Sequence, residues 1–439
     1  MTSVLIKGGR VIDPHSGTDR VADVLLDGGR IVSMGARGVG RVGPASGTRV
    51  IDADGCIVAP GLIDPHVHLR QPGREEAETI ATGTAAAVAG GFTTVCCMPN
   101  TTPVLDNDSM IGAIAHASRE SGVCRVFAVG AVTKGRRGEE LAEIALMARA
   151  GAVGFSDDGD CVASAGVMAR ALAAVRATGR AFMQHCQEPT LTRGASMHAG
   201  SVATRLGLGG WPREAEEIII DRDVRLNRSI GCAYHVQHVS SGGSVEIVRR
   251  ARREGQPVSA EAAPHHLLLT HELVDSHGGY WTSAKMNPPL REAPDVRAIV
   301  EGVADGTVGV LATDHAPHTA EAKGLPFEDA PFGIIGLETA VPLYVEALIT
   351  SGAIGWPRLI ELLTWAPAKL CGLDSQGLGH LTVGGPADVT IIDPNLEWTI
   401  ADSDLAGRSR NTPFVGRRVR GRSITTIVAG SVRHEQARC

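Results

Sequence analysis

The sequence predicts an α/β protein in which a (β/α)8 barrel of the TIM type carries a small β-sandwich domain formed by both termini. Eight short apolar runs alternate with helical stretches through the middle of the 439-residue chain, and strand-like runs with glycine turns occupy both ends. Near-continuous apolar strands are typical of a parallel sheet that helices cover on both faces. Eight strand–helix units favour a closed barrel, and a long doubly wound sheet is the alternative.

Both ends of the chain consist of short strand-like runs with glycine turns, as a β-domain does. Their strand candidates are residues 4–6, 10–12, 23–26, 387–393 and 423–428. A Gly-Gly pair at residues 8–9 separates the first two candidates and another at residues 28–29 follows the third, as hairpin turns do. We therefore expect one composite β-sandwich domain over residues 1–55 and 375–439, and a catalytic barrel over residues 56–374.

The barrel strands are expected where apolar runs end in polar residues. These runs are residues 56–69, 93–98, 125–132, 152–156, 181–185, 233–238, 257–262 and 308–313. Segments rich in Ala, Glu and Arg lie between most of them and predict helices. The clearest of these segments are residues 78–89, 138–150, 167–178 and 243–254.

Composition and charge exclude several classes of protein. The net charge of −6 provides no global basic field for nucleic acid or an anionic membrane. The chain has no run of about 18 apolar residues that could span a bilayer, and its start lacks the pattern of a signal peptide. Nine scattered cysteines without a C-x-x-C pair indicate reduced residues of a cytoplasmic protein.

Polar side chains gather at the ends of the predicted strands, where a barrel enzyme has its active site. His66 and His68 are two residues apart on a strand, so their side chains project from one face. The complete set of candidate metal ligands is His66, His68, Asp158, His185, His238 and Asp314. A histidine taken alone is more often a hydrogen-bonded core residue. Four imidazoles and two carboxylates together exceed one tetrahedral zinc site and suit two ions that share a bridging carboxylate and hydroxide.

Four motifs resemble those of type I bacterial dihydroorotases of the amidohydrolase superfamily. They are residues 60–70 (PGLIDPHVHLR), 155–159 (FSDDG), 285–291 (KMNPPLR) and 312–319 (ATDHAPHT). The resemblance extends over nearly the whole chain, including the split β-domain. It implies a metal-dependent cyclic amidohydrolase with two Zn²⁺ ions per subunit, bridged by Asp158 and a hydroxide.

The scarcity of lysine separates this chain from related cyclic amidases. Hydantoinases, dihydropyrimidinases and allantoinases resemble it but bridge their metals with a carboxylated lysine after the fourth barrel strand. No lysine lies between Lys134 and Lys285, so that bridge is impossible here. The resemblance instead implies an aspartate, and Asp158, 27 residues before His185, is preferred over Asp157.

The resemblance also implies the reaction and the assembly. Type I dihydroorotases reversibly cyclise N-carbamoyl-L-aspartate to L-dihydroorotate in de novo pyrimidine biosynthesis. Read as hydrolysis, a metal-bound hydroxide attacks the ring amide, and Asp314 acts as the general acid and base. The family further implies a cytoplasmic homodimer and a possible complex with aspartate transcarbamoylase.

The substrate carries a carboxylate, which a cation must hold. Arg70 lies two residues past His68, on the same face, and can grip a carboxylate in a fork. The family's remaining substrate contacts map onto His68, Asn100, Asn287, His318, Phe332 and Gly333. Residues 319–331 carry charges, glycine and proline and are expected to form a mobile loop over the site.

Two other functions compete with this one. The first is another cyclic amidase, such as an allantoinase or hydantoinase. The second is a catalytically dead barrel that scaffolds aspartate transcarbamoylase. Such scaffolds lose metal ligands, whereas this chain keeps the whole candidate set.

Overall fold

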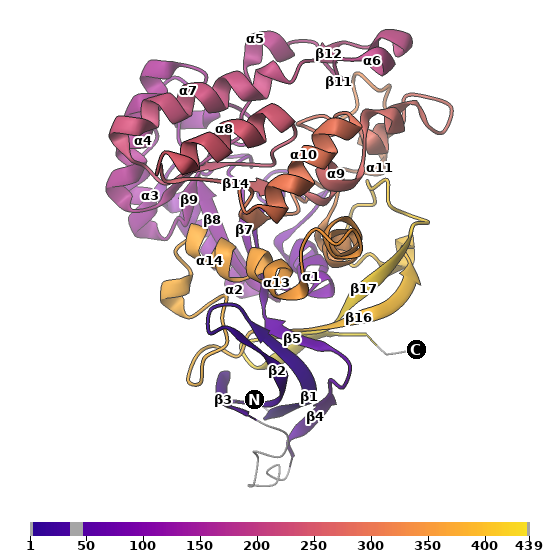
Figure 1. Cartoon of the computed structure of the whole chain (residues 1–439). Helices are drawn as coiled ribbons and strands as arrows, with labels where there is room; N and C mark the ends of the chain where they lie inside the picture. Colours follow the sequence, from indigo (N-terminus) through magenta and orange to yellow (C-terminus); the bar gives the residue numbers. More distant parts are fainter. Residues whose placement is uncertain (1–2, 36–46, 437–439) are drawn as a thin grey trace.

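The computed structural model describes residues 3–35 and 47–436 (Figure 1). The N-terminal part of the predicted composite domain includes residues 1–2 and 36–46, and its C-terminal part includes residues 437–439. These positions lie outside the described residues. Among the described helices, none is long and apolar enough to cross a membrane. All the described cysteines are free thiols, as their scattered positions predict.

The predicted barrel is confirmed as a sheet of eight parallel strands in the order of the sequence. Its strands are β6 (Leu62–Val67), β7 (Phe92–Cys97), β8 (Arg125–Gly130), β9 (Gly154–Phe155), β10 (Ala181–Gln184), β13 (Tyr234–Val236), β14 (Val258–Ala262) and β15 (Val310–Leu311). A parallel bridge between Val67 and His315 brings the chain after β15 back to β6. This bridge nearly closes the sheet and distinguishes a barrel from an open doubly wound sheet.

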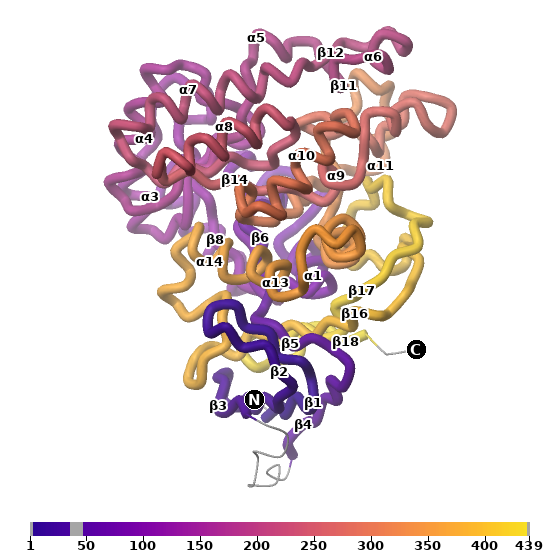
Figure 2. Tube along the Cα trace, in the orientation of Figure 1, coloured from indigo at the N-terminus to yellow at the C-terminus, as the bar shows by residue number. Residues whose placement is uncertain are grey.

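Helices surround the barrel strands on the outside (Figure 2). The longer ones are α1 (Ile80–Gly90), α2 (Asp108–Ser121), α3 (Ile144–Ala150), α4 (Ala165–Thr178), α7 (Glu214–Ile230), α8 (Gly242–Arg253), α10 (Ala293–Ala304) and α13 (Trp356–Leu363). Helix α8 shows why they pack there, because Val245, Val248 and Ala251 are buried on one face. The helix predicted over residues 138–150 begins only at Ile144. Gly138 has a positive φ of 69°, which interrupts helical backbone before that point.

Shorter elements fill the connections at the two ends of the barrel. They are α5 (Pro189–Thr192), β11 (Met197–His198), α6 (Ser201–Leu206), β12 (Gly210–Trp211), α9 (Pro264–Leu268), α11 (Ala320–Lys323), α12 (Ala340–Tyr344) and α14 (Trp365–Leu370). Helix α11 lies in the predicted loop over residues 319–331. The mobility of that loop stays a prediction.

The β-sandwich combines strands from both ends of the chain. Its strands are β1 (Val4–Asp13), β2 (Thr18–Asp27), β3 (Arg30–Gly35), β4 (Arg49–Asp52), β5 (Ile57–Pro60), β16 (Val389–Thr399), β17 (Arg418–Val428) and β18 (Ser431–Glu435). Strand β5 joins the two halves, because it pairs in parallel with β1 and antiparallel with β16. The indigo and yellow strands of Figure 1 therefore form one hydrogen-bonded sheet. The exact domain boundaries stay a prediction.

Two expectations about these strands were wrong. The run over residues 56–69 is not one strand: β5 belongs to the sandwich and β6 to the barrel, with Gly61 between them. The Gly8–Gly9 pair does not form a hairpin, because β1 continues through it with a bulge. A Cβ on Gly9 would lie 2.4 Å from Val58 Cγ2, so this glycine serves close strand packing. The pair Gly28–Gly29 does turn β2 into β3.

Candidate metal centre and substrate pocket

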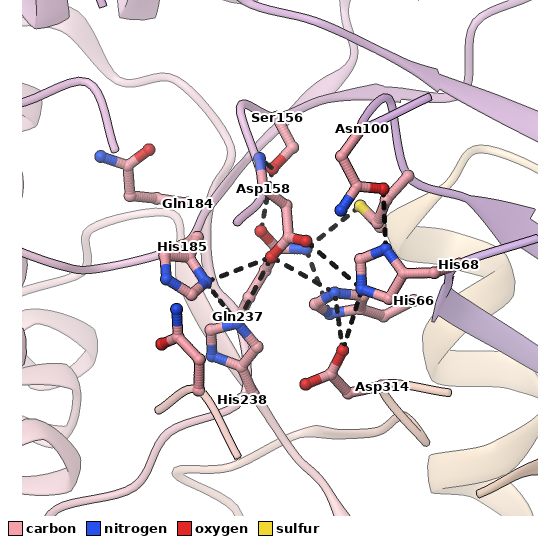
Figure 3. A network of polar contacts seen from close by, with 12 residues as sticks. His66, His68, Asn100, Ser156, Asp158, Gln184, His185, Gln237, His238 and Asp314 are labelled. Atoms are coloured by element: carbon pink, nitrogen blue, oxygen red, sulfur yellow. Dashed lines mark hydrogen bonds and ion pairs between the residues drawn. The ribbon is translucent and has the colours of Figure 1, made fainter. Parts of the chain in front are cut away.

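The first two candidate ligands lie at the end of β6, with His66 in the strand and His68 just after it, and their side chains point toward the same cluster (Figure 3). His66 is fully buried, and its Nε2 lies 3.4 Å from Asp158 Oδ1 and 3.4 Å from Asp314 Oδ1. His68 Nε2 lies 3.1 Å from Asp314 Oδ1 and 3.4 Å from Asp158 Oδ2. Both imidazoles of the H-x-H pair therefore face the same two carboxylates, as their spacing predicts.

A second group of ligands faces Asp158 from the opposite side. Asp158 Oδ1 lies 3.2 Å from His185 Nδ1, which follows β10, and 3.4 Å from His238 Nε2, which follows β13. The two imidazole nitrogens are themselves 2.8 Å apart. Asp158 thus belongs to two overlapping groups, one with His66 and His68 and one with His185 and His238, in each of which the ligand atoms lie within 4.8 Å of one another.

The donors of this cluster fit a metal ion. His66 Nε2 is buried and has no hydrogen-bond partner. His185 Nε2 can donate to Gln187 Oε1 at 2.9 Å, and in that tautomer its Nδ1 lone pair faces His238 Nε2. Nitrogen lone pairs and carboxylate oxygens that converge in a buried space leave a position that only a cation satisfies well.

The electrostatics of the cluster couple its acids and bases. Burial opposes charge on Asp158 and Asp314, but the imidazoles around them, His66 first, lower the pKa of both carboxyls below the ordinary value. The same carboxylates overcome the burial of His66 and raise its pKa well above the ordinary value. The cluster therefore holds its aspartates ionised, as metal ligation requires.

The structure separates the two adjacent aspartates that the sequence left as alternatives. Asp157 turns away from the cluster and accepts hydrogen bonds from the backbone N–H groups of Val132, at 2.8 Å, and Thr133, at 3.0 Å. The Thr133 hydroxyl also donates to it. Burial raises the pKa of Asp157 to about 6. Only Asp158 faces the histidines, and the N–H of Asp158 is held by Ser156 Oγ at 3.0 Å.

A cavity of about 280 Å³ opens beside the cluster. Of the predicted site residues it is lined by His68, Arg70, Asn100, Asp158, His185, His238, Asn287, Asp314, His318, Phe332 and Gly333. His66 lies beneath these, in the barrel. The structure thus brings every predicted metal ligand and substrate contact to one end of the barrel.

The polar groups of the cavity are held by the protein in fixed directions. Arg70 Nε donates to the Pro317 carbonyl at 3.0 Å, and its Nη2 lies 3.3 Å from His318 Nε2. Burial lowers the pKa of Arg70 to about 10, so the guanidinium keeps its charge at neutral pH. His318 Nε2 donates to the Phe332 carbonyl at 2.8 Å. Burial and the charge of Arg70 lower the pKa of His318 to about 2, which keeps this ring neutral.

The amide side chains of the cavity complete its polar surface. Asn100 Oδ1 lies 2.9 Å from His68 Nδ1, and Asn287 Nδ2 donates to Gln187 Oε1 at 3.2 Å. Asn287 Oδ1 is buried without a hydrogen-bond partner, so it can accept a hydrogen bond from a ligand. The charged guanidinium of Arg70 suits an anionic group of a small ligand, and the free amide oxygen of Asn287 suits an N–H group of the same ligand.

Sequence reasoning missed three residues that support the cluster. Gln187 fixes His185, Glu261 contacts His66, and Arg136 donates to the Asp158 carbonyl at 2.5 Å. Glu261 could have been identified from the sequence, because an acidic residue inside the apolar run of residues 257–262 needs a buried partner. Gln187 and Arg136 lie in connections after strands and had no comparable signal.

Comparison with known proteins identifies the family. A dihydroorotase of Pelotomaculum thermopropionicum is 48% identical over 98% of this chain and 98% of its own. A dihydroorotase of Pelobacter propionicus is 46% identical over 98% of this chain and 99% of its own. The chain belongs to the dihydroorotase family. A family model described as Dihydro-orotase-like also matches, over residues 55–244.

The fold of this dihydroorotase family member is shared with solved hydantoinases. The L-hydantoinase (dihydropyrimidinase) from Arthrobacter aurescens superposes with a TM-score of 0.88 and 27% identity, covering 100% of this chain and 97% of its own. A dihydropyrimidinase from Brevibacillus agri has the same fold, with a TM-score of 0.82 and 23% identity over 99% of this chain and 95% of its own. After β9 this chain carries Ser156, Asp157 and Asp158, and no lysine.

Proposed function

We propose that this chain is a dihydroorotase that interconverts N-carbamoyl-L-aspartate and L-dihydroorotate in de novo pyrimidine biosynthesis. The observation that carries the proposal is the placement of Asp158 in two ligand groups directly beside a cavity that contains the charged Arg70. The names of the full-length relatives agree with this activity.

The shared position of Asp158 favours two ions. His66, His68 and Asp158 would hold one of them, with Asp314 in contact with both histidines, and Asp158, His185 and His238 would hold the other. We propose zinc, because imidazole and carboxylate ligands in these numbers suit it, and Asp158 together with a hydroxide would be shared between the two ions. Such ions lower the pKa of bound water towards neutrality and polarise a carbonyl oxygen.

The protein's own residues orient the substrate and move its proton. Arg70 would hold the substrate's α-carboxylate, with Asn100 and His318 beside it. Asn287 and the backbone of Phe332 and Gly333 would contact the ring. Fixed contacts of this kind present the ring amide to the nucleophile in one orientation, which lowers the entropic part of the barrier.

Asp314 is the proposed general acid and base. In hydrolysis an oxygen–carbon bond forms at the ring carbonyl and the ring carbon–nitrogen bond breaks. Asp314 takes one proton from the attacking water and delivers it to the departing nitrogen. The new carboxyl group releases its remaining proton to solvent, and biosynthesis runs the same steps in reverse. The lowered pKa of Asp314 keeps its carboxylate ionised at neutral pH, the form in which it can act as a base.

The deciding experiment is an assay of metal-quantified protein with carbamoyl aspartate and with dihydroorotate. We expect turnover in both directions, and none with hydantoin or allantoin under the same conditions. Turnover of hydantoin or allantoin alone would replace the proposal with another cyclic amidase. Purified protein that retains no metal and shows no turnover after metal addition would support the dead scaffold.

We also propose that the enzyme acts in the cytoplasm as a homodimer that can assemble with aspartate transcarbamoylase. These proposals rest on the family resemblance. Sedimentation of the purified chain, alone and mixed with the transcarbamoylase of the same cell, tests them. A single monomeric species in both samples would contradict both assemblies.

A further inference from the structure

A buried carboxylate lies behind the metal cluster, inside the barrel. Glu261 is on β14 and its exposed fraction is 0%. Its Oε1 lies 2.6 Å from His66 Nδ1 and 3.3 Å from the backbone nitrogen of His238. Its Oε2 lies 3.0 Å from His235 Nε2. One side chain therefore contacts two strands that carry candidate ligands.

The contacts of Glu261 determine which nitrogen of His66 carries the proton. An ionised carboxylate only accepts hydrogen bonds, so His66 Nδ1–H must donate to it. When His66 is neutral, as a metal ligand must be, its lone pair is on Nε2, and this is the atom that faces Asp158 and Asp314.

A further histidine holds Glu261 in place. His235 Nδ1 lies 2.8 Å from Ser259 Oγ, and its Nε2 donates to Glu261. Ser259 and Glu261 are both on β14, while His235 is on β13. The side chain of Glu261 is thus fixed from two directions and cannot rotate away from His66 without breaking both contacts.

The two histidines of the H-x-H pair have different partners behind them. His66 Nδ1 contacts the carboxylate of Glu261, whereas His68 Nδ1 contacts the neutral amide oxygen of Asn100. A carboxylate partner makes an imidazole a stronger metal ligand than a neutral partner does. Retention of the ion should therefore depend on His66 and its partner more than on His68 and its partner.

We propose that Glu261, held by His235, is a positioning residue that fixes the tautomer and orientation of His66 and thereby sets how tightly the centre retains its ion. The proposal rests on the metal centre proposed above and does not depend on which substrate the enzyme turns over. Outer partners of metal ligands typically change metal affinity by roughly 10–100-fold.

The test compares metal affinity in variants of the full chain. Glu261→Gln keeps the size of the side chain but removes its charge, and we expect the dissociation constant for Zn²⁺, measured by competition with a chromophoric chelator, to rise roughly 10–100-fold. Asn100→Ala is the matched control on the other histidine. Because Asn100 is a neutral partner of His68, its loss should leave the dissociation constant for Zn²⁺ within about threefold of wild type. The same variant should raise the KM for dihydroorotate, since Asn100 lines the substrate pocket.

Several outcomes would overturn the proposal. One is a wild-type dissociation constant in Glu261→Gln, and another is a wild-type chain that binds no Zn²⁺. A lower unfolding temperature with unchanged Zn²⁺ affinity would show that Glu261 only stabilises the barrel. If Glu261→Gln does not fold, His235→Phe tests the same link, and unchanged Zn²⁺ affinity in that variant refutes it. If the wild-type chain binds Zn²⁺ but does not turn over dihydroorotate, the proposed function is contradicted. The Zn²⁺ affinities of wild type and Glu261→Gln still test the role of Glu261 in that case.

Discussion

Asp157 and Asp158 are neighbours in the sequence, but their carboxylates have opposite surroundings. Asp157 contacts only backbone and hydroxyl donors of the loop after β8, and Asp158 contacts histidines on three strand ends. At the residue scale the function of the site therefore depends on which of two identical side chains faces inward.

The first prediction separates these two aspartates. Asp158→Asn removes the charge shared by both ligand groups, so we expect elemental analysis to find at least one metal ion fewer per chain. Asp157→Asn is the matched control and should keep the wild-type metal content. It should lower the free energy of unfolding by about 1.5–3 kcal/mol, because a hydrogen-bonded charge is lost. Equal metal content in Asp158→Asn and wild type would refute the bridging role.

The second prediction concerns the proton carrier. Asp314→Asn keeps the size of the side chain but cannot accept the proton, so we expect kcat to fall by about 10²–10⁴-fold in both directions. His66, His68 and Asp158 remain, and metal content should stay near wild type. Initial rates on metal-quantified protein measure the effect. Turnover like that of wild type would contradict the assigned role.

Residue patterns identified the candidate ligands more readily than the side chains that contact them from behind. The H-x-H spacing identifies His66 and His68 as candidates, and the position of Asp314 directly after an apolar run identifies that residue. The contact between His66 and Glu261 joins positions 195 residues apart. No local pattern encodes such a contact, because it exists only after the barrel brings β6 and β14 to one interior.

At the scale of elements, the sequence predicted the number and order of the barrel strands but not every boundary. Strands β5 and β6 form one apolar run, yet they belong to different sheets. Apolar periodicity reports burial and not the identity of the neighbouring strand. The chain changes sheets at Gly61, where a Cβ would lie 2.1 Å from Thr93 Oγ1.

The third prediction tests the close packing at Gly61, where the chain passes from one sheet to the other. Gly61→Ala forces a methyl group against Thr93, and we expect a loss of about 1–3 kcal/mol in the free energy of unfolding, measured by denaturant titration. Gly112→Ala in α2 is the control, because no atom lies within 4 Å of its added Cβ. That variant should be stabilised by about 0.5–1 kcal/mol, since alanine favours a helix interior over glycine. Equal stability of the two variants would refute the steric argument.

At the scale of the whole molecule, the metal cluster draws its ligands from strands around the barrel. His66, Asp158, His185, His238 and Asp314 come from or directly follow β6, β9, β10, β13 and β15. Ions held by residues from these strand ends would bind the folded barrel and not the unfolded chain. Metal binding and folding of the barrel are therefore thermodynamically linked.

The fourth prediction follows from this linkage. Removal of metal with a chelator should lower the unfolding temperature, because a ligand present at a thousand times its dissociation constant contributes about 4 kcal/mol. Calorimetry of the loaded, stripped and reloaded protein measures the effect, and reloading should restore the original transition. Identical transitions in all three samples would contradict a metal that binds only the folded state.

The pairing of β5 with β16 has a consequence for how the chain is made. Val58 pairs with Ile391, so the ribosome must add more than 300 further residues before the partner of β5 exists. At bacterial and eukaryotic elongation rates this takes on the order of tens of seconds. During that interval one edge of β5 is open to other nascent chains, and chaperones that shield strand edges would act on the emerging N-terminal segment.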